Sequence, residues 1–115
     1  FQGLLATNTT GAFLAAREAV RRMTAAGQGG AIVNLSSMAA PLGAGGEFVD
    51  YAASKGAVES MTIGLAREVA GQRIRVNAIR PGLIDTEMQA SSGEPGRVAR
   101  LLSTVPLGRV GTAAE

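Results

Sequence analysis

Two ionisable side chains stand four residues apart in the segment Tyr51-Ala-Ala-Ser-Lys55. On a helix, residues at this spacing share one face, so the phenol and the ammonium would come within reach of each other. A neighbouring positive charge favours the phenolate form of a phenol, whose ordinary pKa is about 10. Such a phenol can exchange a proton with an alcohol or carbonyl oxygen. The spacing also fits a tyrosine that packs on a lysine stem, and taken by itself it favours that packing role.

A pair of serines, Ser36 and Ser37, directly follows the short apolar run of residues 31–35. Glycines and serines bound this run, as expected of a buried parallel strand. Ligands of open α/β sheets bind beyond the carboxyl ends of the strands, so a hydroxyl of Ser37 could hold a substrate oxygen near Tyr51. The alternative for Ser37 is an ST-turn or a helix cap. A nucleophilic role is disfavoured because the chain has no histidine to activate the hydroxyl.

Apolar periodicity predicts the elements that position these groups. Helical spacing of apolar residues predicts helices over residues 5–26 and 50–70, and each is followed by a glycine that can end it. Short β-type runs predict strands over 31–35 and 74–79. Residues 36–50, rich in serine and glycine, are expected to form a loop. Helices that alternate with strands indicate parallel strands joined by helical crossovers, so the predicted fold is a doubly wound α/β sheet of which only the second half is present.

The remaining segments predict a flap and an incomplete domain. Residues 85–103 have a weaker helical pattern that is interrupted at 91–96, which suggests a mobile flap over a pocket. Residues 112–115, Thr-Ala-Ala-Glu, match a capping box, which normally starts a helix. Because the chain also opens on Phe1 rather than methionine, we expect a partial domain over residues 1–115.

Composition excludes several classes of function. The 11 basic and 9 acidic residues give a net charge of +2, which is too balanced to indicate a nucleic-acid partner. Without cysteine or histidine, thiolate and imidazole metal sites are excluded, and acid–base chemistry must come from Tyr, Lys, Asp or Glu. No apolar run approaches the roughly 20 residues that cross a bilayer, and no signal peptide opens the chain. A cytoplasmic protein without a membrane partner is therefore expected.

Five motifs, in order and correctly spaced, cover nearly the whole chain. The motifs are Asn8-Thr-Thr-Gly11-Ala-Phe13, Val33-Asn-Leu-Ser-Ser37, Tyr51-Ala-Ala-Ser-Lys55-Gly-Ala, Leu65-Ala-Arg-Glu68 and Arg75-Val-Asn-Ala-Ile-Arg-Pro-Gly82. Together they resemble the short-chain dehydrogenase/reductase family, whose fold is of the Rossmann type.

The resemblance implies a role for each catalytic candidate. Tyr51 would be the general acid/base, and Lys55 would favour its phenolate and hydrogen-bond the nicotinamide ribose. Ser37 would orient the substrate carbonyl or hydroxyl, and it is preferred to Ser36 because the family usually places the active residue second in the pair. Asn8 would hold a water that links Lys55 to solvent. The alternative for Asn8 is a satisfied polar residue in a helix.

The segment Pro81-Gly82-Leu-Ile84-Asp-Thr86 resembles the nicotinamide-side segment of the family. The implied cofactor is NAD or NADP, with Pro81, Gly82, Ile84 and Thr86 on its carboxamide side. A backbone without Cβ at Gly82 would allow close approach of the cofactor, although a plain turn after a strand is an equal alternative. The resemblance also implies a small carbonyl or alcohol substrate, and a homodimer or homotetramer built from the two long helices.

One family element is missing, which leaves two alternatives open. The glycine-rich turn that grips the pyrophosphate does not appear before any helix, and the nearest glycine cluster, at 43–46, lies in the loop before Tyr51. The residue that selects NAD or NADP is therefore expected outside this sequence. The chain could instead be a truncated or inactive relative, or a nucleotide-sugar epimerase or dehydratase. The intact set of candidates argues against decay, and the match over residues 65–82 favours a simple reductase.

Overall fold

The computed structural model describes residues 1–90, 94 and 96–115. These form two compact units, a first unit over Phe1–Arg80 and a second unit over Pro81–Glu115. The residues predicted to carry catalysis all fall in the first unit. Among the described residues, no helix is both long enough and apolar enough to span a bilayer.

The first long helix contains a π-turn that the sequence pattern did not predict. It comprises α1 (Gln2–Leu4), the π-helical segment η1 (Leu5–Thr10) and α2 (Gly11–Ala26). The predicted helix over residues 5–26 is confirmed, and it begins three residues earlier. Gly27 ends it in the left-handed region, with φ of 69°, where its N–H donates to the carbonyls of the last turn.

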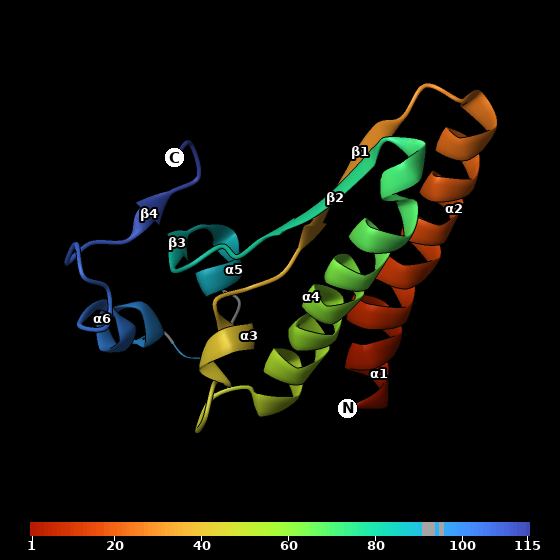
Figure 1. Ribbon diagram of the computed structural model, residues 1–115. Helices are drawn as coiled ribbons and strands as arrows, with labels where there is room; N and C mark the ends of the chain where they lie inside the picture. The colour runs from red at the N-terminus through yellow and green to blue at the C-terminus, as the bar shows by residue number, and fades with distance from the viewer. Residues whose placement is uncertain (91–93, 95) are drawn as a thin grey trace. The chain divides into compact units, whose positions relative to one another are not determined.

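The sheet of the first unit has two parallel strands, as predicted. These are β1 (Gly30–Leu35) and β2 (Ile74–Ile79), paired in register from Gly30 opposite Ile74 to Leu35 opposite Ile79. Parallel strands need a long crossover, which is supplied by the chain between them (Figure 1). Both strands therefore present their carboxyl ends at one edge of the sheet.

The crossover contains one long helix and two short ones. The long helix is α4 (Val49–Val69), close to the predicted 50–70, and it is followed by the 3-10 turn η2 (Ala70–Gln72). The predicted loop contains a short helix, α3 (Ala39–Leu42), that sequence periodicity could not reveal because it is a single turn. Gly43 ends α3 with φ of 79°.

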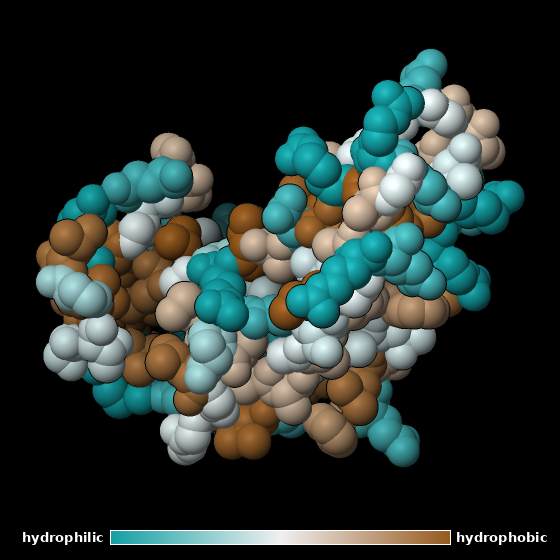
Figure 2. Space-filling view, in the orientation of Figure 1, coloured by the Kyte–Doolittle hydropathy of each residue, from teal (hydrophilic) through white to brown (hydrophobic). Residues whose placement is uncertain are grey.

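The core of the first unit lies between the sheet and the helices α2 and α4. Val69, Ile74 and Val76 are its buried centre, and Val20 of α2 packs against them. The other face of the same strands is open: Val33, Leu35 and Ile79 are between 50% and 60% exposed. One face of the sheet is thus covered by helices and the other is bare, as expected of part of a doubly wound fold. Apolar and hydrophilic side chains alternate over the surface viewed in Figure 2.

The described residues of the second unit form four short elements. The predicted weak helix over 85–103 is divided between α5 (Glu87–Ala90) and α6 (Arg97–Leu102), and residues 91–93 and 95 of the predicted flap lie outside the described part. A short strand precedes α5 and pairs in parallel with a strand near the end, which the sequence pattern did not predict. The elements are β3 (Ile84–Asp85), α5 (Glu87–Ala90), α6 (Arg97–Leu102) and β4 (Gly111–Thr112).

The predicted capping box forms in part. The Glu115 carboxylate accepts a hydrogen bond from the Thr112 N–H at 2.8 Å, which is the reciprocal bond of that motif. The Thr112 hydroxyl, however, donates to the same carboxylate rather than capping a helix. Thr112 belongs to β4 and a turn follows it. Arg109 donates two further hydrogen bonds to the Glu115 carboxylate, so the orientation of this carboxylate is set by Arg109 as well as by Thr112.

Candidate active site

Tyr51 and Lys55 lie on the first two turns of α4 and contact each other. Lys55 Nζ lies 5.7 Å from the centroid of the Tyr51 ring, within the range of a cation–π contact. The same ammonium donates a hydrogen bond of 2.9 Å to the Leu35 carbonyl oxygen at the end of β1. Partial burial lowers the pKa of Lys55, because it disfavours the charged form. Both side chains are half-buried.

The start of α4 is fixed by local hydrogen bonding and by small buried side chains. Asp50 accepts a hydrogen bond from the Tyr51 N–H at 2.8 Å, and an acidic residue suits the positive end of the helix dipole. Ala52 and Ser54 are buried at 5% and 0% exposure. Their small size lets α4 approach the π-turn of the first helix closely, while the Tyr51 and Lys55 side chains stay accessible.

Asn8 reaches α4 through Ser54 rather than through Lys55. Asn8 Nδ2 donates to the Ser54 hydroxyl oxygen at 3.2 Å, and Thr9 donates from its hydroxyl to the Ser54 carbonyl at 3.1 Å. The Ser54 hydroxyl in turn donates to the Tyr51 carbonyl at 2.7 Å. Asn8 and Thr9 both belong to the π-turn, and such turns often occur at functional sites. The expected water link from Asn8 to Lys55 stays a prediction.

Sequence reasoning missed Ser54, although it lies between Tyr51 and Lys55 in the sequence. Two hydrogen bonds from the π-turn end on Ser54, and a third, from its hydroxyl to the Tyr51 carbonyl, lies within α4. Its signal was its position: a polar residue among small apolar ones on the side of the helix facing the core. A hydroxyl at such a place must find partners inside the protein.

The two serines after β1 have different environments. The Ser37 hydroxyl oxygen accepts from the Ala39 N–H at 3.1 Å, which is the ST-turn considered as the alternative for this residue. Its hydroxyl proton remains available, and among the described residues it makes no hydrogen bond with Tyr51 or Lys55. Ser36 is buried at 4% exposure and donates to Glu59 on α4 at 2.6 Å.

The predicted cofactor residues Pro81, Gly82, Ile84 and Thr86 belong to the second unit. Ile84 lies in β3, and its side chain packs over Gly111, where an added Cβ would come within 2.8 Å of it. The Thr86 carbonyl accepts the Gln89 N–H at 3.1 Å at the start of α5. Roles at the nicotinamide stay predictions for all four.

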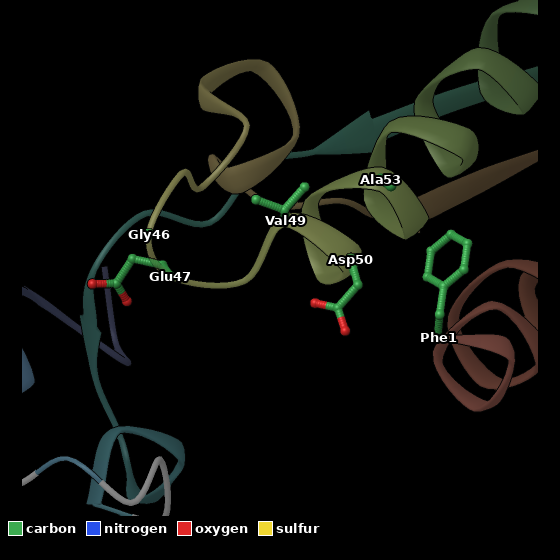
Figure 3. A pocket seen from close by; sticks show the side chains of 6 residues that line it. All are labelled: Phe1, Gly46, Glu47, Val49, Asp50 and Ala53. Atoms are coloured by element: carbon green, nitrogen blue, oxygen red, sulfur yellow. The ribbon is translucent and has the colours of Figure 1, made fainter.

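An open hollow beside the start of α4 is separate from the Tyr51 face of that helix. Figure 3 shows Val49, Asp50 and Ala53 on the first turns of α4, across from Phe1 of the first helix. Neither Tyr51 nor Lys55 lines it. The turn order of a helix places Val49 and Ala53 on a different side from Tyr51, so this hollow is not the proton-transfer site.

The first unit therefore has a mixed α/β structure with parallel strands, and the Tyr–Lys pair lies at their carboxyl ends. Comparisons with known proteins agree with this class. Over residues 1–115 the chain matches the protein family described as Enoyl-(Acyl carrier protein) reductase. It belongs to the short-chain dehydrogenase/reductase family, as the sequence motifs indicated.

Individual relatives support the same family. The chain is 60% identical to the Uncharacterized oxidoreductase YgfF of Escherichia coli over 97% of its own length and 46% of the relative. It is 46% identical to Carbonyl reductase family member 4 of Danio rerio, covering 97% of the chain and 44% of the relative. A short-chain type dehydrogenase/reductase from Mycobacterium marinum superposes with a TM-score of 0.83 and 38% identity, covering 97% and 44%. The chain thus spans less than half of the proteins that it matches.

Proposed function

We propose that the protein to which this chain belongs is an NAD(P)-dependent oxidoreductase that interconverts a carbonyl and an alcohol, with Tyr51 as its general acid/base. The observation that carries the proposal is the contact between the Lys55 ammonium and the Tyr51 ring on α4, beside the end of β1. A fixed positive charge beside a phenol stabilises the phenolate that forms when Tyr51 gives up its proton. Membership of the short-chain dehydrogenase/reductase family supports the oxidoreductase chemistry.

Within the first unit, the hydrogen-bonding groups of the Tyr51–Lys55 pair suit a nicotinamide cofactor. Lys55 uses one of its three N–H donors on the Leu35 carbonyl, so the others could hold ribose hydroxyls. Tyr51 makes no side-chain hydrogen bond among the described residues, which leaves its hydroxyl for the substrate or the ribose. For Pro81, Gly82, Ile84 and Thr86, which belong to the second unit, a role on the carboxamide side is proposed from the family resemblance alone. When bound, nicotinamide supplies or accepts the hydride.

Tyr51 is the group that exchanges a proton with the substrate oxygen. In reduction the phenol donates its proton to the carbonyl oxygen, and the phenolate left behind takes a proton from solvent before the next turnover. In alcohol oxidation the phenolate accepts the hydroxyl proton of the alcohol, and the Lys55 ammonium lies beside it in both directions. The Ser37 hydroxyl is free to donate its proton to the same substrate oxygen and so orient it. Asn8, through Ser54, keeps the π-turn against the Tyr51 turn.

The quaternary structure proposed is a homodimer or homotetramer. Phe13 and Leu14 on α2 and Ile63 on α4 are large, apolar and exposed in the first unit. Large exposed apolar side chains on neighbouring helices suit burial against another copy. The small carbonyl or alcohol substrate, the cytoplasmic location and the absence of nucleic-acid and membrane partners stay predictions.

The test is Tyr51→Phe in the complete protein that contains this sequence. Oxidation of NADPH and NADH is followed with diacetyl, acetoacetyl-coenzyme A, benzaldehyde and crotonyl-coenzyme A as probes. We expect turnover of a carbonyl probe to fall by at least about a thousandfold, because the reaction loses its general acid. The affinity for the cofactor should stay within about twofold of that of the unsubstituted protein. Retention of most activity would remove Tyr51 from the mechanism.

The same panel also tests for an inactive relative and for reduction of a different bond. An inactive relative would turn over none of the probes and bind neither reduced cofactor. Reduction of crotonyl-coenzyme A alone would indicate a carbon–carbon double bond as the target, in line with the description of the matched family. Lys55→Ala should impair both turnover and cofactor binding, because Lys55 has two roles in the proposal.

A further inference from the structure

One carboxylate of α4 holds the ends of both strands of the first unit. Glu59 Oε1 accepts a hydrogen bond of 2.6 Å from the Ser36 hydroxyl and one of 2.7 Å from Arg80 Nε. Its other oxygen accepts from a terminal nitrogen of Arg80 at 2.8 Å. Ser36 directly follows β1 and Arg80 directly follows β2. The three side chains, here called the Glu59 brace, therefore tie two strand ends to one helix.

The Glu59 brace lies next to a backbone hydrogen bond between the two strands and next to the hydrogen bond made by Lys55. The Ser36 N–H donates to the Ile79 carbonyl at 2.8 Å, which extends the pairing of the strands by one residue. Lys55 lies one helical turn before Glu59 and binds the carbonyl of Leu35, the residue before Ser36. Two consecutive residues of the chain are thus held by two consecutive turns of α4. Ser37 is the next residue, so its place relative to the Tyr51 face depends on these bonds.

The charges suit a geometric role better than a stabilising one. Arg80 and Ser36 hold the pKa of Glu59 at about 2, so the carboxylate is ionised throughout the neutral range. The side chains of Glu59 and Arg80 are 19% and 50% exposed, and solvent screens such a pair. The forked guanidinium, however, fixes orientation through two parallel bonds. Glu18 makes comparable bonds to two arginines, but only within α2.

We propose that Glu59 and Arg80 are positioning residues for Ser37, acting through the buried hydroxyl of Ser36. This inference rests on the proposed function, in which Ser37 orients the substrate oxygen. Loss of the brace would let residues 36–38 move relative to α4, and the Ser37 hydroxyl would lose the position that the proposed function requires of it. Displacements of about 1 Å in positioning groups can cost roughly a hundredfold in rate.

The experiment compares Glu59→Gln with Glu18→Gln in the complete protein, using the carbonyl probe of the above panel that turns over fastest. For Glu59→Gln we expect kcat/KM to fall roughly tenfold to a hundredfold, carried by kcat, with affinity for reduced cofactor within about twofold. Glu18→Gln, which also breaks a carboxylate–arginine pair, should leave both within about twofold. An effect of Glu59→Gln no larger than that of Glu18→Gln would overturn the proposal.

A cycle with Ser37→Ala separates positioning from general stability. If Glu59 acts through Ser37, adding Glu59→Gln to Ser37→Ala should change kcat/KM by no more than about threefold, whereas independent effects multiply. An undiminished loss in that background would refute the route through Ser37. Arg80→Lys keeps the charge but loses the fork, so it serves if Glu59→Gln does not fold, and it should show a smaller loss of the same kind.

Amide hydrogen exchange gives a reading that does not depend on the reaction. Exchange of the peptide covering residues 36–42 should quicken in Glu59→Gln and stay unchanged in Glu18→Gln. Unchanged exchange in both would contradict the brace itself. If Tyr51→Phe remained active while exchange quickened as expected, the proposed mechanism would fail but the positioning of the Ser37 segment would stand.

Discussion

Ser54→Ala tests the connection between the π-turn and the Tyr51 turn. The substitution removes a hydroxyl that is 0% exposed and leaves the helix backbone unchanged. Two hydrogen bonds disappear, the one accepted from Asn8 Nδ2 at 3.2 Å and the one donated to the Tyr51 carbonyl at 2.7 Å. The bond from Thr9 to the Ser54 carbonyl can remain, because it uses the backbone.

The expected loss of stability follows from these bonds. Each intramolecular hydrogen bond contributes about 0.5–1.5 kcal/mol net, so two give about 1–3 kcal/mol. The Tyr51 carbonyl also accepts a hydrogen bond within the helix, so the bond from Ser54 to it should contribute near the lower end of that range for one bond. The half-buried Asn8 amide loses its acceptor, so the loss of that bond should cost more. Alanine gains roughly 0.5 kcal/mol over serine in helix propensity, which partly masks the loss.

Ser60→Ala is the matched control, because Ser60 lies exposed on the same helix. Urea unfolding of both variants of the complete protein, at one protein concentration, gives two changes in free energy whose difference removes the propensity term. We expect this difference to be about 1–3 kcal/mol, with Ser54→Ala the less stable variant. A difference below about 0.5 kcal/mol would show that the Asn8–Ser54–Tyr51 bonds do not hold the two helices together.

Two further predictions follow from local geometry. Gly29 has φ of 73°, and a Cβ added there would lie 2.6 Å from the Arg73 carbonyl oxygen, whereas Gly27 has φ of 69° and open space around it. Urea unfolding should therefore show that Gly29→Ala lowers the free energy of unfolding by about 1–3 kcal/mol more than Gly27→Ala does. Equal losses in the two variants would show that no steric clash occurs at residue 29. Burial lowers the pKa of Lys55, so acylation of its amine, mapped by mass spectrometry against pH, should have a midpoint below the roughly 10.4 of a free lysine. A midpoint at or above that value would contradict the partial desolvation of Lys55.

The long elements could be predicted from sequence because each has a strong local period. The strand Ile74–Ile79 lies where it was predicted, and α4 lies within one residue of its predicted bounds at each end. Short elements escaped prediction: α3 is a single turn and β3 pairs two residues with a distant strand, so neither repeats often enough to leave a pattern. The π-turn at residues 5–10 has the same apolar spacing as an α-helix and could not be distinguished from one.

In the candidate site, too, contacts within one helix could be predicted from the sequence, whereas contacts between distant segments could not. Four-residue spacing on one helix sufficed to predict the contact of Tyr51 and Lys55, since helical geometry alone brings them together. Contacts between segments distant in sequence needed the fold: Asn8 binds Ser54 across 46 positions, and Ser36 binds Glu59 across 23. A local sequence pattern does not indicate which polar group will hydrogen-bond to a buried hydroxyl, because the partner depends on how separate helices and strands pack together.

The sequence by itself determined the alternation of helix and strand, the parallel pairing that it requires, and the face of α4 on which a phenol meets an ammonium. Only the tertiary structure decided which side chains hold that face in place, namely Ser54 beneath Tyr51 and Glu59 at the strand ends. The physical reason is range: periodicity acts over a few residues along the chain, whereas hydrogen bonds of buried groups depend on how separate elements pack in space.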